Sequence, residues 1–260
     1  MKTQSPMLVT LEKFTRAVFA VSLLACVYLY LVKDNLPGPA YYDLGQLREP
    51  QQSQTRADNF TTHSNDQQYL IKPLYDYELE GVVVSLHDAD SFLDVTHHRR
   101  WQDYINLRDL CVIWGDNVSS GVYLDMGFKN GTWTCWFSWP NQEVGSRFNG
   151  EQLSNNHLII DDDLVKQALM QAEPGDHVRL RGMLVEYENP GNGFKRGSSV
   201  TRSDTGNGAC ETIYVEAFEM IRKANPGVRQ LYTITFWLCL FSLAGVVWLF
   251  IVTPFRVASD

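Results

Sequence analysis

Two uncharged apolar segments, one near each end, constrain this chain of 260 residues more than any other feature. The first runs from Ala17 to Val32 and the second from Leu231 to Val252. A helix rises about 1.5 Å per residue and must cross roughly 30 Å of hydrocarbon, so the second segment is long enough and the first is slightly short. Arg16 and Lys33 flank the first segment and can reach the headgroups by snorkelling. We therefore expect two membrane-spanning helices that bracket one polar region.

The first segment also has the features of a targeting signal, because basic residues precede an apolar stretch. Ordinary cleavage needs a small-x-small site before polar sequence, and none is present. The run Leu23-Leu24-Ala25-Cys26 resembles a lipoprotein processing box, but apolar residues continue after Cys26. We interpret the segment as an uncleaved anchor, with lipidation or cleavage as the alternatives.

Charge beside the two segments predicts their orientation. Lys2, Lys13 and Arg16 precede the first segment against the single Glu12, which favours a cytoplasmic amino terminus. The basic cluster between 222 and 229 argues for the opposite orientation, but the first helix usually dominates. We expect both termini in the cytoplasm and the intervening domain across the membrane.

The polar region is acidic and suits one domain. The net charge of -8 lies almost wholly in it, so nonspecific attraction to nucleic acid or anionic lipid is not expected. Residues 34 to 68 are rich in Pro, Gln, Asn and Asp without apolar periodicity, which predicts a tether. The expected parts are a cytoplasmic tail (1–16), a transmembrane helix (17–32), a flexible tether (33–68), a soluble domain (69–221), a linker (222–230), a second transmembrane helix (231–252) and a cytoplasmic tail (253–260).

Short β-branched or alternating runs separated by turn signals predict a mainly β domain. The expected strands are Glu78–Leu86, Asp109–Gly115, Thr132–Trp139, Gly175–Glu188 and Glu211–Ile221. Between the third and fourth, Asp161–Asp163 predict the amino-terminal cap of a short helix. Three strands, a helix and two strands is the order of an OB-fold, so we expect an OB-fold-like five-stranded barrel flanked by two transmembrane helices.

Three segments carry a resemblance to a known group of proteins. Asn106–Gly115, Leu153–Leu158 and Asp204–Thr212 resemble segments of bacterial membrane-anchored proteins with an OB-like domain. The resemblance covers roughly Tyr77 to Ile221 and implies a bacterial inner membrane with the domain in the periplasm. It implies no activity and no catalytic residue.

The long connection before the last expected strand is the candidate ligand site, because in OB-folds it borders the ligand face. Arginine side chains together with backbone amides freed by glycines can hold a phosphate or a carboxylate. The alternative is a solvated loop whose arginines pair with the acids of the domain. The predicted ligand-binding residues are Lys195, Arg196, Arg202, Gly206 and Gly208.

Three of the five cysteines, Cys111, Cys135 and Cys210, lie in the domain. An oxidising compartment would allow one bridge among them, whereas a reduced core would leave all three free. The third and fifth strands of the expected barrel are neighbours, so a Cys135 to Cys210 bridge is our first prediction and Cys111 to Cys135 the alternative. No cysteine spacing resembles a structural zinc site.

The sequence contains residue types that an enzyme could use, but their spacing does not bring them together in one site. Between His87 and Arg100, Asp88, Asp90 and Asp94 could gather around a cation, but His97 and His98 would point to opposite faces of a strand. A phosphodiesterase would need Asp88 and Asp90 to converge with Arg196 and Arg202. We predict no metal, no cofactor and no catalytic residue.

A serine hydrolase is equally weakly indicated. Ser154, His157 and Asp161 are present, but no Gly-x-Ser-x-Gly elbow presents the serine. We interpret His157 as a turn residue and the aspartates from 161 to 163 as a helix cap.

Tryptophans in the first half of the domain favour packing and contact over catalysis, since exposed tryptophan is typical of interface centres. We expect a double-anchored bacterial inner-membrane protein whose periplasmic domain binds a partner protein or a small ligand. The expected partners are the bilayer, through two helices, and a protein, and no nucleic acid is expected. The alternative is a membrane-bound metal-dependent phosphodiesterase or envelope hydrolase.

Overall fold

The computed structural model describes residues 6–89, 91, 101–204 and 209–252, which form two compact units. One unit holds two long helices, α1 (Pro6–Val32) and α5 (Pro226–Val252). The other extends from Leu36 to Ala224 and is mainly β. Both expected apolar segments are thus helical, and each helix begins before the uncharged stretch that predicted it.

The two helices are long and apolar enough to cross a membrane, and they pack against each other. Buried positions recur every seven residues along each helix: Ser22 and Leu29 in α1, and Thr235, Ser242 and Leu249 in α5. Seven residues are almost two helical turns, so each set lies on one face. Small residues on such a seam let two helices approach closely in a bilayer.

A polar cluster joins the neighbouring ends of α1 and α5. Lys33 Nζ lies 2.5 Å from Asp34 Oδ2 and 5.8 Å from the ring centroids of both Tyr30 and Tyr232. Asp34 Oδ1 is in turn 3.9 Å from Arg229 Nε. Tyrosines and basic residues are typical of the membrane interface, so this cluster suits the headgroup region.

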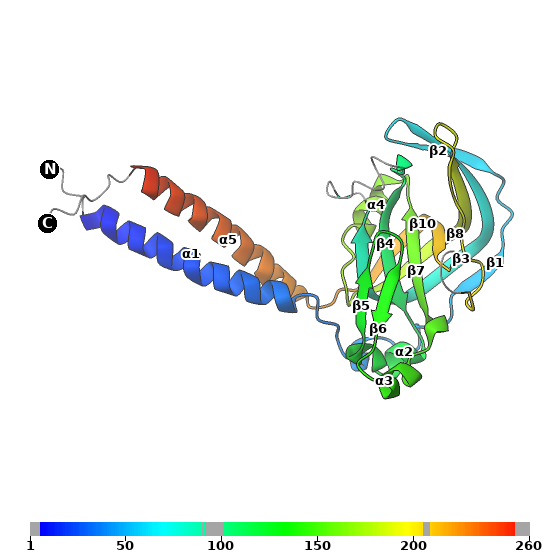
Figure 1. Ribbon diagram of the computed structural model, residues 1–260, viewed down its shortest axis with the longest axis horizontal. Helices are drawn as coiled ribbons and strands as arrows, with labels where there is room; N and C mark the ends of the chain where they lie inside the picture. Colours follow the sequence, from blue (N-terminus) through cyan, green and yellow to red (C-terminus); the bar gives the residue numbers. More distant parts are fainter. Residues whose placement is uncertain (1–5, 90, 92–100, 205–208, 253–260) are drawn as a thin grey trace. The chain divides into compact units, whose positions relative to one another are not determined.

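The β unit contains one mixed sheet and one small sheet (Figure 1). The strands of the large sheet are β1 (Gln51–Gln54), β2 (Phe60–Ser64), β3 (Gln67–Asp88), β4 (Asn106–Ile113), β7 (Leu153–Ile159), β8 (His177–Asn189), β9 (Phe194–Arg196) and β10 (Glu211–Arg222). The small sheet pairs β5 (Gly127–Asn130) with β6 (Cys135–Ser138). The short helices are η1 (Pro39–Tyr41), α2 (Asp116–Ser119), η3 (Val122–Asp125), α3 (Gln142–Arg147), η4 (Gly150–Gln152) and α4 (Asp163–Leu169).

The pairings of the large sheet follow the order β1-β3-β4-β7-β10-β8-β9. Strand β3 also pairs with β8, so the path through β3, β4, β7, β10 and β8 returns to its start. The β7–β10 pair is parallel, and the other pairs are antiparallel. Strand β3 is long enough to pair with β1, β2, β4 and β8 along its length.

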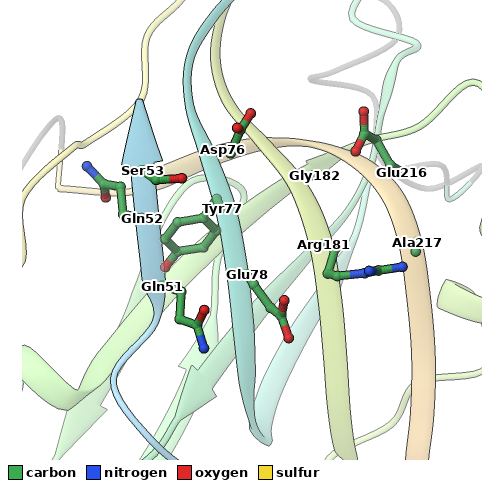
Figure 2. A pocket seen from close by; sticks show the side chains of 10 residues that line it. All are labelled: Gln51, Gln52, Ser53, Asp76, Tyr77, Glu78, Arg181, Gly182, Glu216 and Ala217. Carbon is green, nitrogen blue, oxygen red and sulfur yellow. The ribbon is translucent and has the colours of Figure 1, made fainter. Parts of the chain in front are cut away.

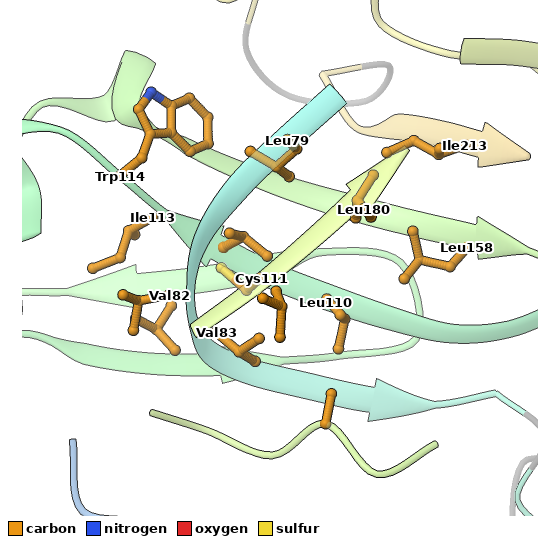
Figure 3. Packing of buried hydrophobic residues seen from close by; sticks show 14 of the residues in the cluster. Leu79, Val82, Val83, Leu110, Cys111, Ile113, Trp114, Leu158, Leu180 and Ile213 are labelled. Carbon is orange, nitrogen blue, oxygen red and sulfur yellow. The ribbon is translucent and has the colours of Figure 1, made fainter. Parts of the chain in front are cut away.

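Apolar side chains from the strands of this path form the main core (Figure 3). Leu79, Leu110, Leu158, Leu180 and Ile213 are buried in it. Every residue of β4 is buried, which means that both faces of this strand are covered. One face of β4 packs into the main core, and polar side chains are enclosed on the other face.

The expected third strand, Thr132–Trp139, is confirmed in part as a strand, but its expected place in the large sheet was wrong. Within the described residues, β6 (Cys135–Ser138) pairs with β5 alone, and the third strand of the path is β7. The stretch from Trp114 to Gln152 is therefore an insertion between β4 and β7. The alternation of Thr and aromatic residues in β6 suits a half-covered hairpin as well as a barrel strand, and only pairing distinguishes the two.

The expected flexible tether, 33–68, is instead part of the β unit from Leu36 onward. Strands β1 and β2 both pair with β3. Tyr42 and Leu47 are buried in the main core, and the Tyr42 hydroxyl donates a hydrogen bond of 2.9 Å to the Gly175 carbonyl. All four side chains of β1 are exposed, so backbone hydrogen bonds to β3 hold the strand in place. Its polar composition gave no sequence pattern typical of a strand.

The short helix was predicted correctly. Asp162 is its N-cap, and Asp162 Oδ1 accepts hydrogen bonds from the backbone N–H groups of Leu164 and Val165 at 2.8 and 2.9 Å. Capping of this kind typically contributes about 1 kcal/mol. The helix lies between β7 and β8 in sequence, at the expected point in the strand order.

Candidate functional site

A buried polar cluster lies on the neighbouring strands β4 and β7. His157 Nδ1 is 2.7 Å from Asp109 Oδ1, and both side chains are fully buried. Asn106 Nδ2 donates a 3.1 Å hydrogen bond to the same carboxylate oxygen. Burial raises the pKa of Asp109, but the charge and hydrogen bond of His157 outweigh it, so the pKa lies below its usual value. His157 is thus a buried strand residue paired with Asp109, and its interpretation as a turn residue was wrong.

The turn between β5 and β6 covers this pair. Asn155 Nδ2 donates to the Trp133 carbonyl at 3.1 Å, and Asn130 Nδ2 donates to Asn155 Oδ1 at 2.7 Å. The Trp133 ring centroid is 6.0 Å from that of His157. The insertion therefore seals the outer face of β4 and β7 with its own side chains.

A disulfide fixes the same insertion to β4. It joins Cys111 to Cys135, with alpha carbons 5.8 Å apart, and Cys210 is a free thiol. The preferred prediction, Cys135 to Cys210, is contradicted, and the alternative pairing is the one observed. Cys135 lies on the inserted hairpin beside β4 and not, as expected, on a strand beside β10. Burial raises the pKa of the Cys210 thiol, and its Sγ lies 3.5 Å from Asn155 Nδ2.

A cavity of about 320 Å³ lies where β3, β8 and β9 meet. Lys72, Lys195 and Arg196 line it, together with the half-exposed Leu70. The Arg196 guanidinium stacks on the Trp133 ring, with Cζ 3.9 Å from the ring centroid. Nη1 of Arg196 is buried without a hydrogen-bond partner in the described structure. We call this cavity the Arg196 pocket.

The two lysines of the Arg196 pocket are paired with acids at its rim. Lys72 Nζ is 2.9 Å from Glu186 Oε2, and Lys195 Nζ is 2.9 Å from Glu188 Oε2. Tyr187, which also lines the cavity, donates a 2.6 Å hydrogen bond to Asp103. Burial raises the pKa of Tyr187 well above its usual value, so its hydroxyl keeps the proton.

The structure brings two of the predicted ligand residues together and separates the third. Lys195 and Arg196 line one cavity, whereas Arg202 forms an ion pair with Glu211, which starts β10 and is 2% exposed. Gly206 and Gly208 lie outside the described residues. Binding at Lys195 and Arg196 stays a prediction.

Arg202 and Glu211 form a second buried polar group with Tyr77. Arg202 Cζ is 5.8 Å from the Tyr77 ring centroid. Burial raises the pKa of Glu211 to about 7, although the positive charge of Arg202 lowers it. Each residue has one buried side-chain atom without a hydrogen-bond partner in the described structure: Tyr77 Oη, Arg202 Nη2 and Glu211 Oε2. Sequence reasoning missed this group because Tyr77 is far from Arg202 and Glu211 in the chain.

The residues weighed for phosphodiester chemistry do not form one site. Asp88 Oδ2 is 3.2 Å from Arg108 Nη2, while Arg196 and Arg202 have the separate environments given above. Asp90, Asp94, His97 and His98 lie outside the described residues. Among the residues that are described, no group of three or more His, Cys, Asp or Glu side chains could hold a metal ion.

The three residues that a serine hydrolase could use, Ser154, His157 and Asp161, do not form one site either. Ser154 Oγ donates to Asn156 Oδ1 at 3.2 Å, and His157 pairs with Asp109. Asp161 accepts hydrogen bonds from Thr62 and Tyr214, each at 2.7 Å. Ser154 and His157 are an odd number of residues apart on β7, so they point to opposite faces.

Comparison of the chain with protein-family models, with curated proteins and with solved structures finds no match. The functional argument therefore depends on the described side chains.

Proposed function

We propose that this chain is a double-anchored protein of a bacterial inner membrane whose periplasmic OB-like barrel binds an anionic ligand. The closed path of pairings supports the barrel, because its five strands follow the chain order 1-2-3-5-4, with the third and fifth adjacent. Helix α4 lies between the third and fourth of these strands, as in an OB-fold. The basic residues before α1 support the periplasmic side.

The observation that carries the proposal is Arg196 at the wall of its pocket. Stacking on Trp133 holds the guanidinium in place, so little side-chain entropy is lost when a ligand binds. Nη1 of Arg196 is buried without a hydrogen-bond partner in the described residues, and we infer that it donates to an oxygen of the ligand in the complex. Guanidinium groups favour carboxylates and phosphates because two parallel hydrogen bonds match their geometry.

The paired lysines do not oppose this assignment. Both ion pairs are well exposed, and exposed pairs are worth roughly 0–1 kcal/mol. Lys72 and Lys195 can therefore leave their glutamates and contact a ligand at small cost. Leu70 supplies an apolar wall, so the ligand class is a phosphate or carboxylate that carries a small apolar group.

The binding experiment uses the full chain in an uncharged detergent and a phenyl phosphate titration by calorimetry. Arg196→Gln should weaken binding about tenfold or more, since hydrogen bonds to charged groups contribute about 1.5–3 kcal/mol. Arg147→Gln removes the same charge at an exposed position on α3 and should leave affinity unchanged. Equal affinity of the parent and Arg196→Gln would contradict the proposed site.

The orientation is tested separately with a cysteine placed at Asp58, an exposed position, in a Cys210→Ser background. A thiol reagent that cannot cross membranes should label this cysteine in intact spheroplasts. Labelling that appears only after lysis would place the domain in the cytoplasm.

A further inference from the structure

The insertion between β4 and β7 carries an exposed aromatic surface. Within the described part of the β unit, every large aromatic side chain that is exposed lies on this insertion: Trp136 (64% exposed), Phe137 (38%) and Trp139 (49%). Leu124 of the same insertion is 47% exposed. We call these four side chains the aromatic patch. By contrast, the hollow of about 520 Å³ across β1, β3, β8 and β10 is lined mainly by charged and amide side chains (Figure 2).

The pleat of the β5–β6 hairpin points Trp136 away from the core. Cys135 is bonded to Cys111 of β4, so the next side chain along β6 lies on the opposite face of the hairpin. Lys129 is the partner of Trp136 across the hairpin, and it is exposed as well. The outer face of the hairpin thus combines an indole ring with a long cationic side chain, which is typical of a membrane interface.

Packing beneath the aromatic patch holds its rings in place. The Phe137 ring centroid lies 5.3 Å from that of Phe148 and 6.2 Å from that of Trp139. Trp139 also lies against α3, because a Cβ at Gly145 would be 2.7 Å from Trp139 Nε1. The rings are therefore preorganised, and little side-chain entropy is lost when they contact another surface.

The chain enters the β unit beside Leu124. This residue is part of η3, and the hydroxyl of the preceding Tyr123 donates a hydrogen bond to the Pro37 carbonyl. A Cβ at Gly121, just before η3, would lie 3.2 Å from Pro39 Cγ. The first residues of the β unit therefore run along the element that carries Leu124, and η3 in turn contacts α3.

The chain leaves the β unit close to the point where it enters. The Tyr41 hydroxyl donates a 2.6 Å hydrogen bond to the Lys223 carbonyl, and Arg222 Cζ is 4.0 Å from the Tyr41 ring centroid. Residues 33–35 alone separate α1 from the β unit, and Asn225 alone separates the β unit from α5. An extended residue spans at most about 3.6 Å, so the longer link reaches no further than roughly 14 Å.

We propose that the aromatic patch lies in the headgroup region of the bilayer that α1 and α5 span. This contact depends on the membrane anchoring that is part of the proposed function. The short links hold the end of the β unit with Leu124 at the bilayer surface, where tryptophan is enriched. Lys129 and Arg147 are exposed and can reach lipid phosphates, but the exposed acids Asp125 and Glu143 offset them. The occupant is therefore a zwitterionic phospholipid surface.

The experiment reports the surroundings of the patch with a fluorophore on Ser138→Cys. Ser138 is exposed and lies two residues from Trp136 on β6, so it shares the outer face. Ser53→Cys, on the exposed strand β1 outside the insertion, is the matched control. The full chain, with the three free cysteines replaced by serine, is labelled with nitrobenzoxadiazole and placed in phosphatidylcholine nanodiscs. Phosphatidylcholine with a nitroxide on its choline group should quench the label at Ser138→Cys and leave that at Ser53→Cys bright.

Variants of the patch connect the quenching to the aromatic side chains. Trp136→Ser with Trp139→Ser should abolish the quenching of the label. Leu164→Ser removes an exposed apolar side chain from α4, outside the insertion, and should leave the quenching unchanged. If the double variant has a lowered Tm, Trp136→Ser alone, at the most exposed position of the patch, gives the same test.

The outcomes distinguish the bilayer from other occupants. Equal quenching at Ser138→Cys and Ser53→Cys overturns the proposal. A blue-shifted label at Ser138→Cys that the lipid nitroxide does not quench shows that protein covers the patch, and this result also overturns it. Flotation of the full chain with vesicles tests the anchoring separately. A chain that does not float contradicts the membrane anchoring, whereas a chain that floats without quenching contradicts the patch contact alone.

Discussion

His157 and Asp109 are joined by a 2.7 Å contact at a point where neither side chain has any exposed surface. The two residues are 48 positions apart in the chain, and they meet because β4 and β7 are neighbours in the sheet. Removing one member of a buried pair leaves the polar atoms of the other without a partner. The β5–β6 turn keeps water away from this pair, so we expect the turn to contribute to stability.

Asp109→Ala should destabilise the β domain by about 3–5 kcal/mol, because the buried polar atoms of His157 and Asn106 would lose the carboxylate that binds them. Guanidinium unfolding followed by tryptophan fluorescence measures the loss. Glu186→Gln breaks the exposed pair with Lys72 and should cost less than about 1 kcal/mol. Similar losses for the two variants would contradict the buried ion pair.

Glu211 should make stability depend on pH near neutrality. Its pKa is raised from 4.5 to about 7 in the folded state, so the folded state holds the proton more tightly than the unfolded chain. Its stabilising contribution is therefore complete below pH 4.5 and is lost as pH rises to about 7. The free energy of unfolding of the parent should fall relative to that of Glu211→Gln by up to about 3 kcal/mol over this interval.

Thermal and urea unfolding of the parent and Glu211→Gln at a series of pH values between 4 and 8 measures this difference. A constant difference across the series would show that Glu211 has an ordinary pKa in the folded domain.

The disulfide should hold the insertion to β4. Cys111→Ser and Cys135→Ser should each lower the free energy of unfolding by about 3 kcal/mol, the typical value for a loop of this length. Cys210→Ser should retain the bridge. Peptide mapping without reduction should find Cys111 linked to Cys135 and Cys210 open to alkylation after unfolding; a Cys135–Cys210 peptide would contradict the structure.

The helix seam should depend on Gly245. A Cβ at this position would lie 3.1 Å from Thr15 Cγ2, so Gly245→Leu should push α5 away from α1. Crosslinking between Tyr30→Cys and Tyr232→Cys, in a background without Cys26 and Cys239, should fall in this variant. Val247→Leu, at a half-exposed neighbouring position, is the matched control and should crosslink like the parent.

The sequence predicted elements whose signal is local. The two apolar segments, the runs around Val82, Leu110 and Val178, and the aspartate cap of α4 all carry their own pattern of burial or capping. Strand β1 carried no such pattern, because its side chains are exposed and its pairing with β3 uses backbone groups alone. An edge strand of this kind cannot be distinguished from a linker by composition.

Pairing between segments that are distant in the chain was the second feature that the sequence did not predict. The alternation in β6 predicted a barrel strand, and that error also produced the wrong disulfide, since Cys135 was placed beside β10. Of the candidate site, Lys195 and Arg196 were identifiable as cations in a loop rich in glycine. Trp133, which holds Arg196, and Lys72, which shares its cavity, come from segments that only the fold brings near. One local signal for the buried pair was available, because Asp109 directly precedes the apolar run Leu110–Ile113.

The most direct test of the account observes the Arg196 guanidinium during ligand titration. In the full chain labelled with ¹⁵N-arginine, the Arg196 Nε signal is assigned by its loss in Arg196→Lys, and phenyl phosphate is then added. The account predicts that this signal shifts and saturates while the Arg147 signal stays unchanged. A stationary Arg196 signal at ligand concentrations that saturate the calorimetric binding would contradict the proposed function.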